Sequence, residues 1–85
     1  MKQFTYTVTA PEGLHARPAR LLAETVRGLS CSVTIEKGGA SAQADRLMAL
    51  MLLGVGCGDT VTVTLAGEEE ERKALNLEAF FRAHL

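Results

Sequence analysis

The chain has 85 residues, of which 47% are hydrophobic and 22% are charged, so it can form one small domain with a core. This length excludes a multidomain enzyme. A domain of this size buries only about 60% of its extended surface, so we expect any site to be shallow and at the surface. Nine basic and ten acidic residues give a formal net charge of -1, which argues against a nucleic-acid partner.

The sequence predicts neither membrane insertion nor export. No apolar run approaches the roughly 20 residues of a membrane span, and Met1 to Thr9 alternates threonine with apolar residues. Cys31 and Cys57 are far apart and outside any C-x-x-C motif, and the chain has only two histidines, so we expect no metal site. We interpret the cysteines as reduced thiols of a cytoplasmic protein.

The first two predicted elements are a strand and a helix. Apolar residues alternate with threonines from Phe4 to Val8, which is typical of a strand with one buried face. Helical spacing then runs from Ala19 to Leu29, with Gly28 near its end, and Pro18 is tolerated because first-turn amides lack intrahelical partners. The opposite face of this helix is mainly basic, and its charged residues are Arg17, Arg20, Glu24 and Arg27.

A hairpin and a short helix follow. Ser32 to Lys37 and Ala40 to Ala44 predict two strands, because Gly38-Gly39 between them accepts positive φ. The segment from Arg46 to Leu53 is almost wholly apolar and precedes Gly54, a plausible C-terminal stop. This pattern indicates a short helix.

The last two elements are a strand and a helix. Thr60 to Leu65 alternates again, and Glu68 to Glu71 opens a helix whose last turn carries Arg82 and His84. Both ends complement the helix dipole, so we interpret the acidic run as capping and not as a metal site. His84 lies near the end of the chain, beyond the expected packed framework, and needs no chemical role.

The element order is therefore β-α-β-β-α-β-α within one domain, residues 1–85. The strands are too short and too alternating for a buried parallel sheet. We predict an α+β fold with one four-stranded antiparallel sheet, helices on one face and the other face open to water.

His15 is the best candidate for chemistry. It follows a glycine-containing loop and precedes a helix, so the backbone N–H groups of Ala16 and Arg17 are candidates to bind an anion that His15 carries. A neutral imidazole is a competent nucleophile near pH 7, and the Arg17 guanidinium would stabilise a phosphoryl group on it. The residue pattern alone leaves a second interpretation open, because a histidine at a helix start is as often a cap or a surface residue.

The string from Ala10 to Ala19, Ala-Pro-Glu-Gly-Leu-His-Ala-Arg-Pro-Ala, resembles the active-site motif of the histidine-containing phosphocarrier (HPr) family of the bacterial sugar phosphotransferase system. The resemblance covers nearly the whole chain. Its other matches are Leu47, Met48, Leu50, Met51, Leu53-Gly54-Val55, Gly58-Asp59 and Thr60 to Val63. The resemblance implies an open-faced β-sandwich, in agreement with the element order above.

The resemblance also implies a role. The histidine at the position of His15 accepts phosphate on Nδ1 from phospho-enzyme I and passes it to an enzyme IIA domain of a sugar permease. The arginine at the position of Arg17 neutralises the phosphoryl oxygens. We therefore expect a monomeric carrier that is not itself an enzyme and needs no cofactor.

The short helix is a candidate docking surface. Its apolar residues cannot all face one core, so some of Leu47, Met48, Met51 and Leu52 should be exposed. Adaptable methionines suit a surface that fits several partners, and the family docks through this region. We include Arg20 and Arg46 as basic residues of this surface. The alternative is that the tail and loops cover the helix.

Two positions depart from the family pattern. Arg46 occupies the site of a regulatory serine found in many Gram-positive members, so kinase control there is not expected. A cation at a helix start is unfavourable, so either Asp45 caps the helix or Arg46 faces an acidic partner. Glu12 stands where the family has a small or neutral residue. Its carboxylate would repel a phosphoryl group if it faced His15 and would matter little in water.

Two competing functions remain. The first is a binding module of the same fold in a regulatory or nitrogen-type phosphotransfer branch, and intact His15 and Arg17 favour carriage over it. The second is a small hydrolase resembling acylphosphatase, which has a similar element count. The sequence lacks the phosphate-cradling loop that such a hydrolase needs.

Overall fold

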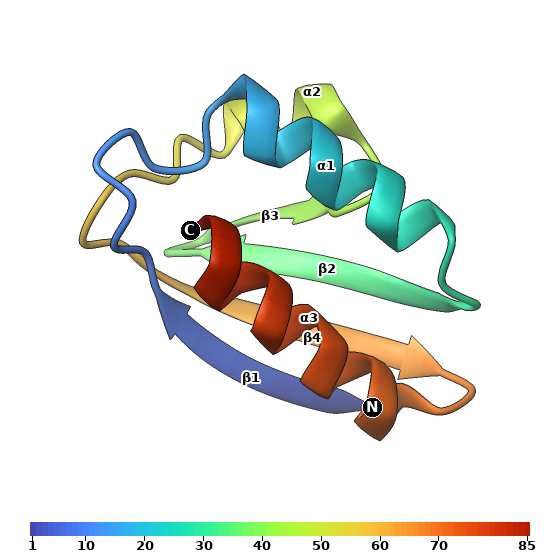
Figure 1. The fold of residues 1–85 in the computed structure, drawn as a ribbon. Helices are drawn as coiled ribbons and strands as arrows, with labels where there is room; N and C mark the ends of the chain where they lie inside the picture. The colour runs from blue at the N-terminus through green and yellow to red at the C-terminus, as the bar shows by residue number, and fades with distance from the viewer.

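The computed structural model describes residues 1–85, and its seven elements follow the predicted order β-α-β-β-α-β-α. All neighbouring strands are antiparallel, in the order β1-β4-β2-β3. Helices α1 and α3 lie over one face of the sheet, and α2 lies beside α1 near β3 (Figure 1). The elements are β1 (Lys2–Thr7), α1 (Ala16–Arg27), β2 (Cys31–Lys37), β3 (Ala40–Gln43), α2 (Leu47–Leu52), β4 (Thr60–Gly67) and α3 (Glu70–His84).

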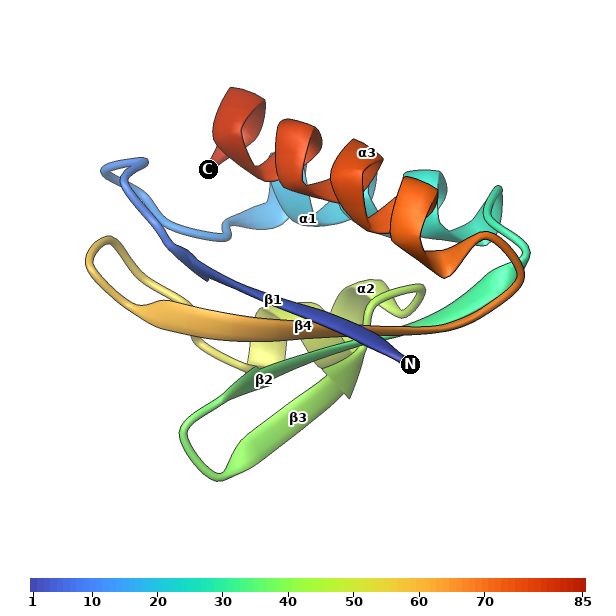
Figure 2. The ribbon, with the colours of Figure 1, turned by 90° about the horizontal axis from the view of Figure 1, so that it is seen from below.

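The core lies between the sheet and the helices. Strand residues alternate, so that Ile35 and Val63 are buried under the helices while threonines cover the other face, which no helix overlies in Figure 2. Phe81 of α3 is 1% exposed and makes edge-to-face contacts with Phe4 and Tyr6 at 5.7 and 5.5 Å between ring centroids. Full burial of each large apolar side chain contributes about 1.5–3 kcal/mol, so these contacts fix α3 on the sheet. The predicted fold class is confirmed.

The strand ends differ from the sequence prediction, because hydrogen bonds and not hydropathy decide where a strand ends. The first strand, β1, already begins at Lys2, which pairs with Leu65. Val8 lies just beyond its end, although it is buried and its N–H donates to the Asp59 carbonyl at 2.9 Å. The neighbouring strand, β4, continues to Gly67.

The start of α2 corrects one prediction. Asp45 does not cap this helix, because the residue at the N-cap is Arg46, in an extended conformation and with no side-chain cap bond. The chain turns before Arg46, whose N–H donates to the Gln43 carbonyl at 3.1 Å, and this turn places Asp45 one residue too early. Gly54 follows the helix with φ +68°, as expected of a C-terminal stop.

The start of α3 corrects another prediction. Only Glu70 and Glu71 of the acidic run lie in the first turn, because Glu69 is the N-cap and takes a left-handed conformation. Glu70 Oε2 accepts the Gly67 N–H at 3.1 Å. One carboxylate, that of Glu70, therefore accepts the backbone hydrogen bond at the entry to the helix, and the rest of the acidic run is not needed for capping. Both cysteines are free thiols, and none of the helices is long and apolar enough to cross a bilayer.

Candidate functional site

The loop between β1 and α1 is held against the Val55-Gly56 segment. Gly13 takes φ +65°, and a Cβ built on it would lie 2.5 Å from the Val55 carbonyl oxygen. Only glycine accommodates both the left-handed backbone and this approach. Leu14 is buried and its N–H donates to the same Val55 oxygen at 2.9 Å. The loop therefore delivers His15 to the first turn of α1 at a fixed position.

His15 is the N-cap residue of α1, and its side chain makes no capping bond. Its carbonyl accepts the Ala19 N–H at 3.0 Å, whereas the N–H groups of Ala16 and Arg17 have no acceptor in the protein. Pro18 has no N–H to satisfy. Two free amide donors thus lie beside a half-buried imidazole at the positive end of a 12-residue helix. This arrangement disfavours the interpretation of His15 as an ordinary cap, and the free donors together with the helix dipole favour a negatively charged ligand.

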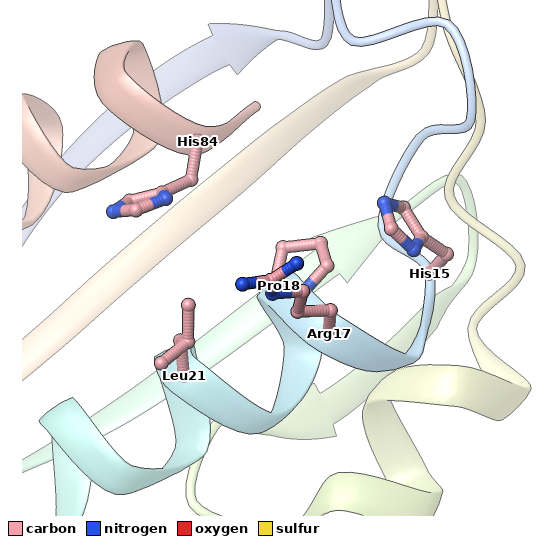
Figure 3. A pocket seen from close by; sticks show the side chains of 5 residues that line it. All are labelled: His15, Arg17, Pro18, Leu21 and His84. Carbon is pink, nitrogen blue, oxygen red and sulfur yellow. The ribbon is translucent and has the colours of Figure 1, made fainter.

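A surface pocket of about 380 Å³ opens beside this imidazole. Its lining residues are His15, Arg17, Pro18, Leu21 and His84, as Figure 3 shows. Three of the five side chains are cationic or can become so, and none is acidic. The lining is therefore electrostatically suited to an anion, and the pocket lies at the surface, as expected for a chain of this size.

A second depression of about 420 Å³ connects the histidine site to α2. It is lined by Ala16, Arg17, Arg20 and Leu47. Arg17 borders both pockets, so the surface beside α2 is continuous with the pocket at the N-terminal end of α1.

The short helix exposes three of its six side chains, all of them apolar. Met48 is 69% exposed and Leu52 82%, and Met51 is exposed to a smaller degree. Leu47 is half-buried, while Leu50 is fully buried and anchors the helix to the core. The tail and loops do not cover α2.

The charged residues that depart from the family pattern point to solvent. Arg46 is exposed, and no carboxylate pairs with it. Glu12 is also exposed and does not line the His15 pocket. The repulsion that Glu12 would exert on a phosphoryl group is therefore screened by water.

A polar contact behind the site was missed by the sequence reasoning. Asp59 Oδ2 accepts the Gly56 N–H at 2.8 Å, and Lys37 Nζ lies 3.0 Å from the same oxygen. Lys37 also donates to the Gly54 carbonyl at 2.7 Å. The Gly56 hydrogen bond first, and then the Lys37 ammonium, lower the pKa of Asp59. These bonds fix the segment against which Gly13 packs, and only the Gly58-Asp59 match to the family pointed to it.

The structure also changes the interpretation of His84. The end of the chain is packed and not loose, because Leu85 is 3% exposed and its oxygen accepts the N–H groups of Thr9 and Ala10 at 2.7 and 2.8 Å. This packing brings His84 to the pocket of His15. No sequence signal links two residues so far apart in the chain.

The open-faced sheet, the histidine at a helix N-terminus and the adjacent arginine together define a phosphocarrier domain. The family described as "PTS HPr component phosphorylation site" matches residues 2–83. The chain belongs to this HPr family.

Two relatives contain a similar segment as a small part of a much longer protein. A multiphosphoryl transfer protein of Xanthomonas campestris pv. campestris is 41% identical over 68 residues, which are 80% of this chain and 8% of that protein. The phosphoryl donor subunit DhaM of the PEP-dependent dihydroxyacetone kinase of Pantoea ananatis is 33% identical over 78 residues, which are 92% of this chain and 16% of that protein. The chain thus spans a small part of these relatives.

Among solved structures, HPr-C-His from Thermoanaerobacter tengcongensis superposes with a TM-score of 0.91 at 32% identity. The match covers 98% of this chain and 93% of that one. The similarity therefore extends over the full sheet and all three helices, and includes the segment that carries His15.

Proposed function

We propose that residues 1–85 act as one phosphoryl carrier domain, which accepts a phosphoryl group on His15 from phospho-enzyme I and passes it to an enzyme IIA domain of a sugar permease. One observation carries this proposal. The imidazole of His15 makes no capping hydrogen bond and lies beside the free amides of Ala16 and Arg17 and beside the Arg17 guanidinium.

In the proposed transfer, a neutral ring nitrogen of His15 attacks the phosphorus atom of the donor. The N–P bond to His15 forms while the bond from phosphorus to the donor atom breaks, and the donor atom leaves with its electron pair. The free amides of α1 and the Arg17 guanidinium stabilise the phosphoryl oxygens. Transfer of the phosphoryl group from His15 to an acceptor follows the same steps in reverse: the N–P bond breaks while a bond from phosphorus to the acceptor atom forms. An open pocket suits such reversible transfer, because two partners need access in turn.

The docking surface that we propose comprises Arg20, Arg46, Leu47, Met48, Met51 and Leu52. The exposed methionines give an adaptable apolar centre, and the arginines give a basic rim that attracts acidic partners. The free thiols, including the exposed Cys57, suit the reducing cytoplasm. The carrier is expected to act there as a monomer, without cofactor, membrane or nucleic-acid partner.

A second acceptor is supported by one comparison. Because the match to the dihydroxyacetone kinase donor subunit covers 92% of this chain, a kinase of that class is the alternative destination of the phosphoryl group. No comparable observation favours a purely regulatory or nitrogen-type binding module.

The test is incubation of the chain with phosphoenolpyruvate and enzyme I, followed by mass spectrometry. The expected result is an acid-labile increase of one phosphate in the unmodified chain and in a His84→Ala variant, and no increase in His15→Ala. Acceptance by His15→Ala, with a melting temperature close to that of the parent chain, would show that another residue carries the group.

A further inference from the structure

His84 lines the pocket of the phosphoryl acceptor but has no part in the transfer described above. We propose that His84 is an auxiliary anion-binding residue: its protonated imidazole attracts the phosphoryl group on His15 across the pocket and so links phosphoryl load to proton uptake. This inference rests on the proposed function, because it requires a phosphoryl group on His15.

The first argument is placement. The pocket has the first turn of α1 on one side and the last turn of α3 on the other, and His84 is its only lining residue from α3. In Figure 3 the Arg17 side chain lies between the two imidazoles. No carboxylate lines the pocket, so an anion bound there has cationic or titratable groups on two sides.

The second argument is rigidity. The His84 ring packs on Phe80 with 4.5 Å between centroids and 39° between planes. Phe80 in turn contacts the fully buried Phe81, which packs against β1. The imidazole is exposed, yet its position follows from the core and from the bonds between the Leu85 oxygen and the loop after β1. A fixed group interacts with a pocket ligand without a large entropic cost.

The third argument is the local charge balance. His84 lies between charges of opposite sign: the C-terminal end of α3 is negative, and Arg17 and the N-terminal end of α1 are positive. On α3 itself, Arg82 is two residues away and projects to the opposite side of the helix. In the sheet beneath α3, Asp59 precedes β4 and is bound to Lys37, and β1 has its one charged residue at Lys2, at the far end.

Phosphorylation reverses this balance. A phosphoryl group brings about -1.5 to -2 charges to the pocket near pH 7 and outweighs the single charge of Arg17. His84 then gains a proton more readily. By reciprocity, protonation of His84 favours the phosphorylated state of His15 by the same factor.

The experiment uses the full chain and NMR, since only two histidines contribute imidazole signals. The pH titration of the His84 ring protons is recorded before and after phosphorylation by enzyme I, with the load on His15 verified by mass spectrometry. We expect the midpoint of the His84 titration to rise by about half a pH unit or more, equivalent to about threefold tighter proton binding. An Arg82→Ala variant, which loses a cation from the same helix end, should show the same rise.

A second measurement follows the transfer equilibrium. In His84→Gln, phosphoryl transfer from enzyme I onto the chain should become about threefold less favourable at pH 6 and should be unchanged at pH 9. A His84 midpoint that does not move in a fully phosphorylated chain overturns this inference alone. A chain that takes up no phosphate overturns the proposed function, and this inference with it.

Discussion

Gly13 lies so close to Gly56 that a Cβ on Gly13 would stand 2.6 Å from the Gly56 Cα. Because the Asp59 carboxylate accepts the Gly56 N–H and Lys37 donates to the Gly54 carbonyl, this segment has little freedom to withdraw. The position of His15 therefore depends on two glycines in contact, one in the histidine loop and one in the segment before β4.

The first prediction concerns Gly13→Ala. This change places a methyl group against backbone atoms at φ +65°, so it should destabilise the fold by about 1–3 kcal/mol and slow phosphoryl acceptance. Urea unfolding and enzyme I-dependent labelling measure the two effects. Gly39→Ala is the matched control, because Gly39 lacks a positive φ and a Cβ there would meet no atom within 4 Å. Equal stability and equal labelling rates in Gly13→Ala and Gly39→Ala would show that the close approach at Gly13 does not position His15.

The second prediction concerns pH and Asp59. Since the pKa of Asp59 is lowered in the folded protein, its ionised form stabilises the fold above its ordinary value near pH 4. That contribution is lost as the pH falls through the lowered pKa. Asp59→Asn should reduce stability at pH 7 and flatten the loss of stability between about pH 5 and pH 3.

Urea midpoints measured from pH 7 to pH 3 test this expectation. Asp45→Asn is the control, because Asp45 is exposed and makes no ion pair or side-chain hydrogen bond. Parallel curves for the parent chain and Asp59→Asn would mean that the bonds to Gly56 and Lys37 do not stabilise the fold.

The third prediction concerns Arg17. Arg17→Ala should fold normally, because the side chain is exposed, and should transfer the phosphoryl group about 10- to 150-fold more slowly. Loss of one charge-assisted hydrogen bond to an anion, worth about 1.5–3 kcal/mol, gives this range. Rapid-quench kinetics measure the rate. Arg27→Ala, at the other end of α1, should transfer at the parent rate, and a similar defect there would indicate a general charge effect.

The fourth prediction separates docking from packing on α2. Met48→Glu should weaken binding to enzyme I by tenfold or more and hardly change the melting temperature, since Met48 is 69% exposed. Leu50→Ala should instead cost about 2–5 kcal/mol of stability, because Leu50 is fully buried. Calorimetric titration and thermal unfolding distinguish the two. A loss of stability in Met48→Glu without a binding defect would place that residue in the core.

Apolar periodicity predicted α1 and the three longer strands, because each of these elements buries one face. The short elements β3 and α2 were predicted instead from the glycines that turn or stop the chain, Gly38-Gly39 and Gly54. The histidine site was also predictable, since Gly13, His15 and Arg17 are close in the chain. The position of Arg46, and not Asp45, at the N-cap of α2 was not predictable, because it depends on how the chain turns after β3. The approach of His84 to His15 depends on the packing of α3, and tertiary contacts leave no local pattern.

The last prediction concerns Arg46, which occupies the N-cap of α2 in the extended conformation that a capping serine adopts, yet makes no capping bond. Arg46→Ser should stabilise the protein by about 1 kcal/mol, because the hydroxyl can accept an N–H of the first helical turn. The same change removes a cation from the docking surface and should slow association with an acidic partner such as enzyme I, more at low than at high ionic strength. Arg46→Ala separates the effects, because it should slow association equally without the gain in stability.

The six residues of α2 include no serine or threonine, so we expect HPr kinase to label the Arg46→Ser variant and not the parent chain on this helix. Stopped-flow association at two salt concentrations and thermal unfolding test the pair, and an association rate indifferent to both substitution and salt would show that Arg46 does not face the partner.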